Sequence, residues 1–259
     1  MTQPQKINPA TILAEVRSAN CELHGDYESR KSTFEGREIW TACPTCFEDF
    51  GKQQMRDQEL ARREAARANI MQNAAIPARF ANRKLDNYTA ETSGQKRALE
   101  ISLVYAENFP DALSNGRSMV FCGTPGTGKT HLAVGIAHSV IAQGYTASFT
   151  TAMDAIRTVR ETYRKGNDKT EREVIAQFAK PDLMIIDEVG SQLNTEAEKV
   201  TLFDLINARY QAMKPMIVMS NLTLSEVEQY IGERAFDRLR ENGGHAVVFS
   251  WPSYRRGVK

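Results

Sequence analysis

The segment Gly123-Thr124-Pro125-Gly126-Thr127-Gly128-Lys129-Thr130 decides the fold of this chain. It fits the phosphate-loop pattern G-x-x-x-x-G-K-[ST] at every fixed position. An apolar run at residues 118–122 precedes it, and residues 129–143 follow with apolar side chains at helical spacing. In this order of strand, loop and helix, backbone N–H groups and the helix N-terminus face a phosphate. Glycine-rich turns are also common without a ligand, but the Lys-Thr pair at this offset favours a nucleotide site.

The cofactors predicted from this segment are ATP and Mg²⁺. Lys129 can reach the β- and γ-phosphates, and the Thr130 hydroxyl can bind magnesium. The expected cofactor-binding residues here are Gly123, Thr124, Pro125, Gly126, Thr127, Gly128, Lys129, Thr130 and the following His131.

The composition indicates a globular chain with balanced charge. With 259 residues, 41% of them hydrophobic, the chain can form one large or two small domains. A net charge of +1 gives no general attraction to nucleic acid or membrane, so such binding would need local patches. Residues 1–10 lack the apolar core of a secretory signal, and no apolar run approaches the roughly 20 residues that span a bilayer. We therefore expect a cytoplasmic protein without a membrane partner, in which disulfides are rare.

Three of the four cysteines are clustered near the N-terminus. The knuckle Cys21-Glu22-Leu23-His24 is separated by residues 25–42 from a second knuckle, Cys43-Pro44-Thr45-Cys46. This spacing is typical of a zinc ribbon, with His24 in place of one thiolate. The stretch between the knuckles is too small for a core of its own, so a structural Zn²⁺ ion would supply much of the folding energy. The alternative is a set of ordinary reduced cysteines, and Cys122 is expected to be a small core residue.

A helix is predicted over residues 53–73, which are rich in Ala, Glu, Arg and Gln and contain no Gly or Pro. Arg62, Arg63 and Arg67 could contact nucleic acid, although a solvated charged face is the simpler interpretation. The expected domains are a zinc-binding partner module at 1–52, a connecting helix and linker at 53–76, and an ATPase domain at 77–259.

From Pro77 onward, helical and strand patterns alternate, which predicts an α/β fold with a parallel sheet. The capping-box pattern from Ser225 to Glu228 predicts a helix start. The expected strands are 119–122, 145–150, 183–186, 216–220 and 246–251, and the expected helices include 96–109 and 152–164.

Polar residues follow two of the predicted strands, and ligands of parallel sheets bind at such carboxyl ends. Asp187 is predicted to hold magnesium, and Glu188 to orient and deprotonate the water that attacks the γ-phosphate. The alternative is a surface acidic pair. Asn221 could position that water or sense the γ-phosphate, although Asn is also common in turns. Further on, the helix containing Arg234, Arg238 and Arg240 could place one arginine on the phosphate of a neighbouring subunit.

Taken together, these motifs resemble the DnaC family of bacterial or phage helicase loaders, within the DnaC/IstB branch of AAA+ ATPases. The resemblance covers roughly residues 77 to 256. The matching pieces are LDNY at 85–88, GTPGTGKTHLA at 123–133, LMIIDEVG at 183–190, Asn221, GERAFDRLRENG at 232–243 and WPSYR at 251–255.

The resemblance implies roles for individual residues. Asn221 resembles the first sensor, and Arg238 the arginine finger that acts in trans, with Arg234 a weaker candidate. Arg255 resembles the second sensor, which acts in cis on bound ATP. Because the chain ends just after Arg255, we expect no C-terminal helical lid.

The resemblance also implies a function in the initiation of DNA replication, as part of a primosome. The ATPase domains would self-associate side by side with ATP at each joint. The N-terminal module would grip the hexameric replicative DNA helicase and help place it on single-stranded DNA. The DNA-contacting region would fall near 150–165, although a helix with an exposed basic face would look the same. Its candidate residues are Arg157, Arg160, Tyr163, Arg164 and Lys165.

One departure from the family leaves the partner of the N-terminal module open, because the familiar loader has a purely helical segment there. Three other functions are alternatives. An IstB-type transposition helper ATPase shares the core motifs, but the GERAFDRLR and WPSYR segments favour the loader. A small-molecule kinase would not need the hydrolytic Glu188. A zinc-dependent DNA-binding regulator would use the nucleotide as a structural ligand only.

Overall fold

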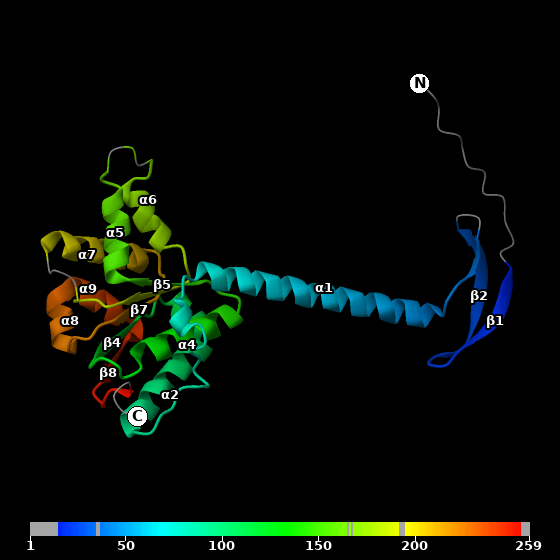
Figure 1. The fold of residues 1–259 in the computed structure, drawn as a ribbon, viewed down its shortest axis with the longest axis horizontal. Helices are drawn as coiled ribbons and strands as arrows, with labels where there is room; N and C mark the ends of the chain where they lie inside the picture. The colour runs from blue at the N-terminus through cyan, green and yellow to red at the C-terminus, as the bar shows by residue number, and fades with distance from the viewer. Residues whose placement is uncertain (1–14, 35–36, 165, 167, 192–194, 255–259) are drawn as a thin grey trace. The chain divides into compact units, whose positions relative to one another are not determined.

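The computed structural model describes residues 15–34, 37–164, 166, 168–191 and 195–254. The chain divides into two compact units, Met1–Ala65 and Ala66–Lys259, whose elements are labelled in Figure 1. Within the described ranges, no helix is both long enough and apolar enough to cross a membrane.

The first unit contains a small antiparallel sheet that the sequence did not predict. Its strands β1 (Val16–Cys21), β2 (Gly25–Phe34) and β3 (Arg37–Trp40) pair in that order. The Arg17 guanidinium stacks 4.1 Å from the centre of the Trp40 ring. Most side chains here are exposed. The sheet therefore has little core of its own, which agrees with the expectation that a metal supplies folding energy.

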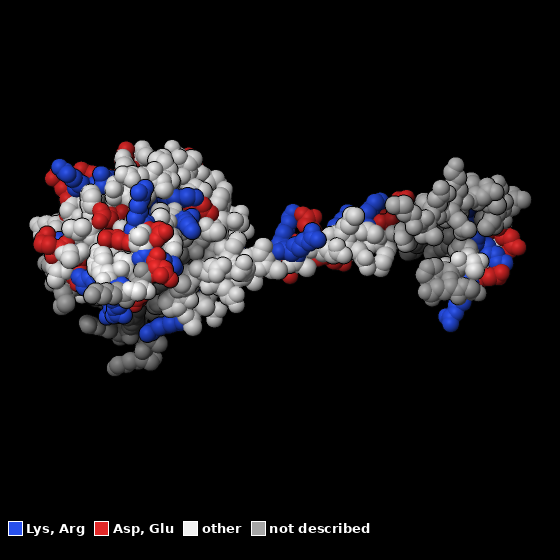
Figure 2. Space-filling model, turned by 90° about the horizontal axis from the view of Figure 1, so that it is seen from above, with Lys and Arg blue, Asp and Glu red and all other residues white. Residues whose placement is uncertain are grey.

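Helix α1 (Pro44–Asn73) runs from the first unit into the second and buries none of its residues. It begins at Pro44 rather than at residue 53, because proline is favoured in the first turn of a helix. Figure 2 shows basic and acidic side chains interspersed along it, as expected for a solvated helix. After α1 the chain enters the core of the second unit, where Ala74 is fully buried and its carbonyl accepts a hydrogen bond from the Phe149 N–H at 2.8 Å.

The second unit is built on a five-stranded sheet in the order β5-β6-β7-β4-β8, and every pairing is parallel. The strands are β4 (Met119–Gly123), β5 (Ala147–Thr151), β6 (Leu183–Asp187), β7 (Met216–Met219) and β8 (His245–Phe249). The helical elements are η1 (Ala78–Phe80), α2 (Ser93–Glu107), α3 (Phe109–Ser114), α4 (Lys129–Ala142), α5 (Ala152–Glu161), α6 (Glu171–Phe178), α7 (Glu196–Gln211), α8 (Leu224–Ile231), α9 (Glu233–Arg240) and η2 (Glu241–Gly243).

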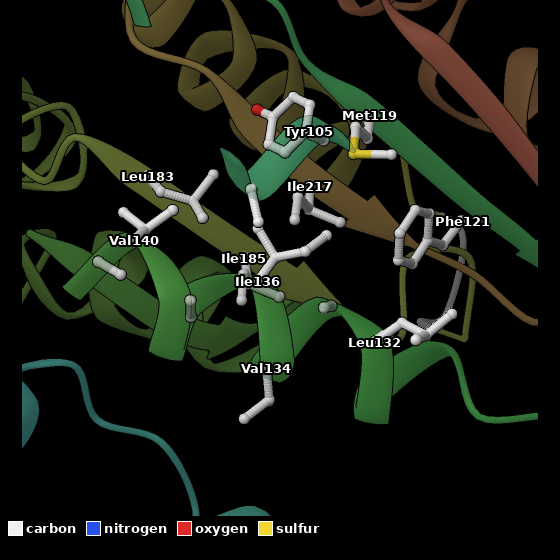
Figure 3. Packing of buried hydrophobic residues seen from close by; sticks show 14 of the residues in the cluster. Tyr105, Met119, Phe121, Leu132, Val134, Ile136, Val140, Leu183, Ile185 and Ile217 are labelled. Atoms are coloured by element: carbon white, nitrogen blue, oxygen red, sulfur yellow. The ribbon is translucent and has the colours of Figure 1, made fainter. Parts of the chain in front are cut away.

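Both faces of this sheet are buried, because alternate side chains of each strand enter two different cores. Phe121, Ile185 and Ile217 pack with residues of α2 and α4 on one face, as Figure 3 shows for α4. On the other face, Met184 and Val218 pack with residues of α5, α7, α8 and α9. Cys122 is fully buried in this second core, as predicted. The predicted α/β fold with a parallel sheet is therefore confirmed.

Several helix starts are fixed by capping boxes that the sequence analysis missed or misplaced. The prediction of a box from Ser225 to Glu228 was wrong, because α8 is capped by Thr223, whose hydroxyl accepts from the Glu226 N–H. The Glu226 carboxylate accepts from the Thr223 N–H in return. The backbone of Thr223 is extended, as the N-cap position of a helix requires. Thr223 is therefore the N-cap of α8, two residues before the predicted Ser225.

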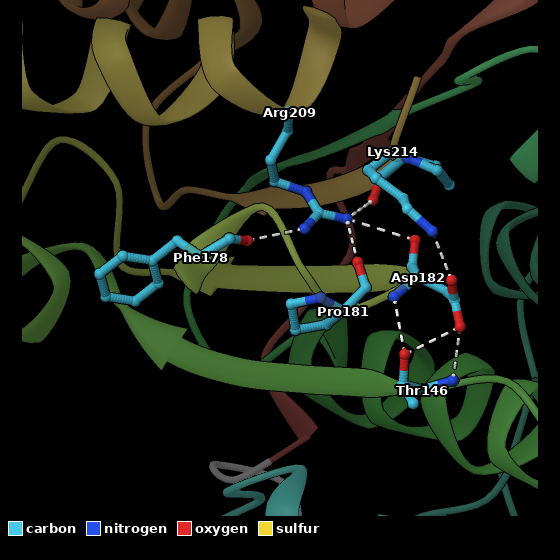
Figure 4. A network of polar contacts seen from close by, with 7 residues as sticks. Thr146, Phe178, Pro181, Asp182, Arg209 and Lys214 are labelled. Atoms are coloured by element: carbon cyan, nitrogen blue, oxygen red, sulfur yellow. Dashed lines mark hydrogen bonds and ion pairs between the residues drawn. The ribbon is translucent and has the colours of Figure 1, made fainter. Parts of the chain in front are cut away.

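A buried arginine ties together the N-terminal ends of β6 and β7, at the end of the sheet opposite the phosphate loop (Figure 4). Arg209 of α7 is fully buried and lies among backbone carbonyls instead of carboxylates. Burial lowers its pKa to about 9, so the guanidinium stays charged at neutral pH. It donates to the carbonyls of Phe178 (2.8 Å), Pro181 (3.0 Å), Asp182 (3.2 Å) and Pro215 (2.6 Å).

Candidate nucleotide and metal sites

The phosphate loop joins the end of β4 to the first turn of α4, as the sequence predicts. Glycine is required at both ends of the loop. At Gly123 (φ +121°) an added Cβ would lie 2.3 Å from the Phe249 carbonyl oxygen, which belongs to the neighbouring strand β8. At Gly128, the cap of α4 (φ +98°), it would lie 2.7 Å from the Tyr88 ring. The close packing of these neighbours holds the loop in shape before any ligand binds.

The Lys129 side chain is folded over the loop and is only 6% exposed. Its Nζ donates to the carbonyl oxygens of Gly123 at 2.7 Å and Thr124 at 2.9 Å. An ammonium group held in this way lies beside the backbone that would surround a phosphate, and phosphate oxygens could take over as its acceptors.

Thr130 and Asp187 meet at the carboxyl end of the sheet, as predicted. The Thr130 Oγ1 donates to Oδ2 of Asp187 at 3.2 Å, and the Glu188 N–H donates to its Oδ1 at 2.7 Å. Burial raises the pKa of Asp187 above its usual value, despite these two hydrogen bonds. A hydroxyl and a carboxylate are hard oxygen ligands that suit Mg²⁺, and a cation here would favour the ionised carboxylate. The residues therefore fit the predicted ion.

Glu188 and Asn221 lie just beyond the ends of adjacent strands, β6 and β7, and both are exposed. Glu188 has a positive φ of 61°, an uncommon conformation for a non-glycine residue that is found at functional sites. The two loops are linked by Ser220, whose fully buried hydroxyl donates to the Val189 carbonyl at 2.6 Å. This linking role of Ser220 was not predictable from the sequence, because only the pairing of the two strands reveals it.

The candidate arginine fingers differ in their environment. Arg238 folds back on α7, with its Cζ 5.0 Å from the Phe203 ring centre and 5.3 Å from that of Tyr210. Its Nη1 is buried and has no hydrogen-bond partner among the described residues. Arg234 on the same helix is exposed. Arg238 also lines an open hollow together with Asp237, Arg240 and Glu241. Arg255, expected to be the second sensor, lies outside the described residues.

Three of the candidate DNA-contacting residues already have carboxylate partners. Arg157 pairs with Asp154 at 3.7 Å, and the Tyr163 hydroxyl donates to Glu171 at 3.0 Å. Arg160 lies 3.4 Å from the buried carboxylate of Glu198. These partners reduce the charge that the region offers to a DNA backbone. Of the remaining two candidates, Arg164 is exposed, and Lys165 lies outside the described residues.

The four predicted metal ligands come together in the first unit. One ligand atom from each of Cys21, His24, Cys43 and Cys46 lies within 4.8 Å of all the others. The Cys21 and Cys46 sulfurs are 3.4 Å apart, and His24 Nδ1 is 3.2 Å from Cys46 Sγ. The hydrogen bond to Cys21 and burial raise the pKa of Cys46 to about 11. Ionisation of the Cys46 thiol at neutral pH would therefore need a cation beside its sulfur. Three sulfurs and one imidazole nitrogen are a typical donor set for tetrahedral zinc.

Asp49 supports this cluster from the second turn of α1, and the sequence analysis did not identify it. Its Oδ2 lies 3.4 Å from Nε2 of His24, the ring nitrogen that faces away from the sulfurs. Metal-binding histidines commonly donate their second N–H to a carboxylate, which fixes the tautomer. Asp49 follows Cys46 by three residues on α1, but the helix predicted from sequence began only at residue 53, so this spacing gave no signal.

The family model for IstB-like ATP binding proteins matches residues 43–256. The chain belongs to this family. It is 32% identical over 177 residues to the replicative helicase loader DnaC of Escherichia coli K12, covering 68% of this chain and 71% of that protein. The loader of the same name from Buchnera aphidicola of Acyrthosiphon pisum is 32% identical over 190 residues, covering 73% and 76%. The crystal structure of the DnaC helicase loader superimposes with a TM-score of 0.60 at 24% identity, covering 66% of this chain and 99% of that one.

These comparisons confirm an AAA+ ATPase of the DnaC/IstB branch. The family match contains the phosphate loop, Asp187, Glu188 and Asn221. It begins at Cys43 and therefore omits Cys21 and His24, so the metal centre depends on the geometry of the cluster alone.

Proposed function

We propose that this protein is an ATP-dependent loader that binds the hexameric replicative DNA helicase and places it on single-stranded DNA when replication starts. The observation that carries the proposal is the 32% identity to replicative helicase loaders over more than two thirds of their length. Because these relatives are named replicative helicase loaders, they favour a loader over the transposition helper. The Thr130–Asp187 contact supports an intact nucleotide site.

Within the nucleotide site, each residue has one proposed task. Lys129 and the loop N–H groups bind the phosphates of ATP, while Thr130 and Asp187 would hold Mg²⁺. Bound Mg²⁺ would neutralise charge on the phosphates. Glu188 takes the proton of the attacking water, and Asn221 orients that water. Arg255 is proposed to contact ATP in cis.

Assembly of several copies is proposed to complete the site, with Arg238 reaching the γ-phosphate held by the neighbouring copy. Two features support this role: the open hollow beside Arg238, and its Nη1, which has no hydrogen-bond partner in the part of the chain that the structure describes. Self-association through the ATPase domains would therefore couple turnover to assembly.

The N-terminal unit is proposed to grip the helicase and to hold a structural Zn²⁺ ion through Cys21, His24, Cys43 and Cys46. Cys43 directly precedes α1, and Cys46 lies in its first turn. Zinc would consequently fasten the start of α1 to the three-stranded sheet. The four protein ligands leave no open position for catalysis.

The proposal is tested by mixing the purified protein with the replicative helicase of its host and measuring the mass of the complex, with and without ATP. A complex of defined stoichiometry is the expected result, and removal of residues 1–73 should abolish it. If no complex forms under any nucleotide condition, the loader function is wrong. The transposition helper would then be the better hypothesis, and a transposase the next partner to test.

A further inference from the structure

Two family motifs each contain an aromatic residue that has no part in the chemistry described so far, and both of these residues contact one atom of the phosphate loop. Tyr88 closes the LDNY motif and Trp251 opens the WPSYR motif, at opposite ends of the domain sequence. The Trp251 indole Nε1 donates to the Thr127 carbonyl oxygen at 2.9 Å. The Tyr88 hydroxyl donates to the same oxygen at 3.4 Å. A carbonyl in the middle of the loop is thus bound from outside by two aromatic side chains.

Holding this carbonyl also fixes an N–H group. The peptide between Thr127 and Gly128 is planar and trans, so its N–H points opposite to its C=O. A carbonyl held toward Tyr88 and Trp251 therefore directs the Gly128 N–H away from them, into the loop. The preceding peptide, between Gly126 and Thr127, is also held through its carbonyl, which accepts a hydrogen bond from the Tyr254 N–H at 2.9 Å.

The two aromatic rings are themselves held in place. Trp251 is 8% exposed, its ring centre lies 4.9 Å from that of Phe249, and a Cβ on Gly94 of α2 would come within 3.1 Å of it. Tyr88 packs edge-on against His131, with ring centres 5.1 Å apart.

His131 is fixed in turn by the segment that carries Tyr88. Its Nε2 lies 2.8 Å from the Asn87 side-chain oxygen and 2.9 Å from the Lys84 carbonyl. In this position the His131 ring supports Tyr88. Donors that cannot rotate away keep a loop prearranged, which lowers the cost of binding.

We propose that Tyr88 and Trp251 are positioning residues for nucleotide binding. They hold the Thr127 carbonyl outward so that the Gly128 N–H is ready to donate to a phosphate of ATP or ADP. This inference rests on nucleotide binding and not on helicase loading, so the two can fail separately.

The test uses the full chain with two variants. Tyr88→Phe keeps the ring and removes only the hydroxyl, whereas Trp251→Phe keeps an aromatic side chain but loses the N–H donor together with part of the indole volume. Dissociation constants for Mg·ADP are measured by calorimetry, and the Gly128 amide is followed by ¹H–¹⁵N NMR during the titration. Loss of one neutral hydrogen bond should weaken binding about five-fold in Trp251→Phe, and about two-fold in Tyr88→Phe because its bond is longer. In both variants the Gly128 amide resonance should shift less on binding than it does in the unmodified chain.

Tyr105→Phe is the matched control. It also removes a tyrosine hydroxyl that donates to a backbone carbonyl, that of Arg117 at 2.8 Å, but Arg117 precedes β4 whereas the phosphate loop follows it. This control should leave ADP affinity and the Gly128 shift unchanged. The proposal is overturned if Trp251→Phe binds ADP normally with a normal Gly128 shift. It is equally overturned if Tyr105→Phe weakens ADP binding as much, because general loss of stability would then explain both.

Discussion

The guanidinium carbon of Arg238 lies 5.0 Å from the centre of the Phe203 ring. The ring centre of Tyr210, two helical turns further along α7, lies 5.3 Å from the same carbon. Each cation–π contact is worth about 0.5–2 kcal/mol, and one buried donor of the guanidinium has no partner among the described residues. Leaving both rings for a phosphate would therefore cost about 1–4 kcal/mol, and hydrogen bonds to the phosphate, including one from that donor, would offset this cost.

Arg238→Ala should leave ATP binding intact and reduce turnover, because a finger that acts in trans contributes only to the transition state. We expect a loss of roughly 10³-fold, the lower end for an arginine finger. ATP affinity and phosphate release are measured at protein concentrations at which the copies assemble. Arg234→Ala distinguishes the two candidates, since a larger loss there would transfer the role to Arg234. Weakened ATP binding in Arg238→Ala would instead point to a cis or folding role.

Glu188→Gln should bind ATP normally and hydrolyse it about 10²- to 10⁴-fold more slowly, because an amide cannot accept the proton of the attacking water. Phosphate release and ATP binding are compared with those of the unmodified chain. Helicase loading is measured in parallel. Loading that survives the loss of hydrolysis would exclude a motor function and favour a DNA-binding regulator with a structural nucleotide.

Elemental analysis should find about one zinc ion per chain, and chelation should unfold the first unit, because its sheet lacks a substantial core. Folding is followed by the near-ultraviolet signal of Trp40, after Trp251→Phe has removed the other tryptophan. A folded, metal-free first unit would rule out the zinc centre.

Asp49→Asn should retain the zinc ion but weaken its affinity about 10- to 100-fold, since the carboxylate orients His24. Competition with a chromophoric chelator measures this affinity. Asp57→Asn on the same helix removes one negative charge away from the cluster and is the matched control. Equal affinities in the two variants would show that Asp49 does not support the site.

Arg209→Met should lower the free energy of unfolding of the ATPase domain by about 4 kcal/mol. Methionine replaces the aliphatic part of the arginine side chain but leaves several buried carbonyls without their donor. Each buried carbonyl left without a hydrogen bond costs about 1–3 kcal/mol. Urea denaturation measures the change. Lys214→Met, which removes only a partly exposed ion pair with Asp182, should cost about 1 kcal/mol or less. Similar costs for the two variants would contradict a special role for Arg209.

The parts of the molecule that were predictable from sequence are those with a local signal. The phosphate loop and the Asp187–Glu188 strand end depend on neighbours in the chain, and the structure places both as expected. The strands β1–β3 escaped prediction because their side chains are mostly polar and exposed, so no alternating pattern marks them. Arg209 and the aromatic contacts of Arg238 depend on α7 packing against distant elements, which no spacing in the sequence reveals.

The Lys214–Asp182 pair should make the stability of the ATPase domain depend on pH in the acid range. Burial raises the pKa of Asp182, but hydrogen bonds from Lys214 and Thr146 outweigh it, so the net pKa lies below the usual value of 3.8. A lowered pKa in the folded state means that the unfolded chain takes up its proton first as pH falls. The stabilisation is therefore complete above the unfolded pKa and is lost as pH drops through the folded one. Asp182→Asn should thus be less stable than the unmodified chain at pH 7, and the difference should shrink toward pH 3. Urea midpoints at both pH values test this, and a difference that is the same at pH 3 and pH 7 would show that the charge of Asp182 is not what stabilises this end of the sheet.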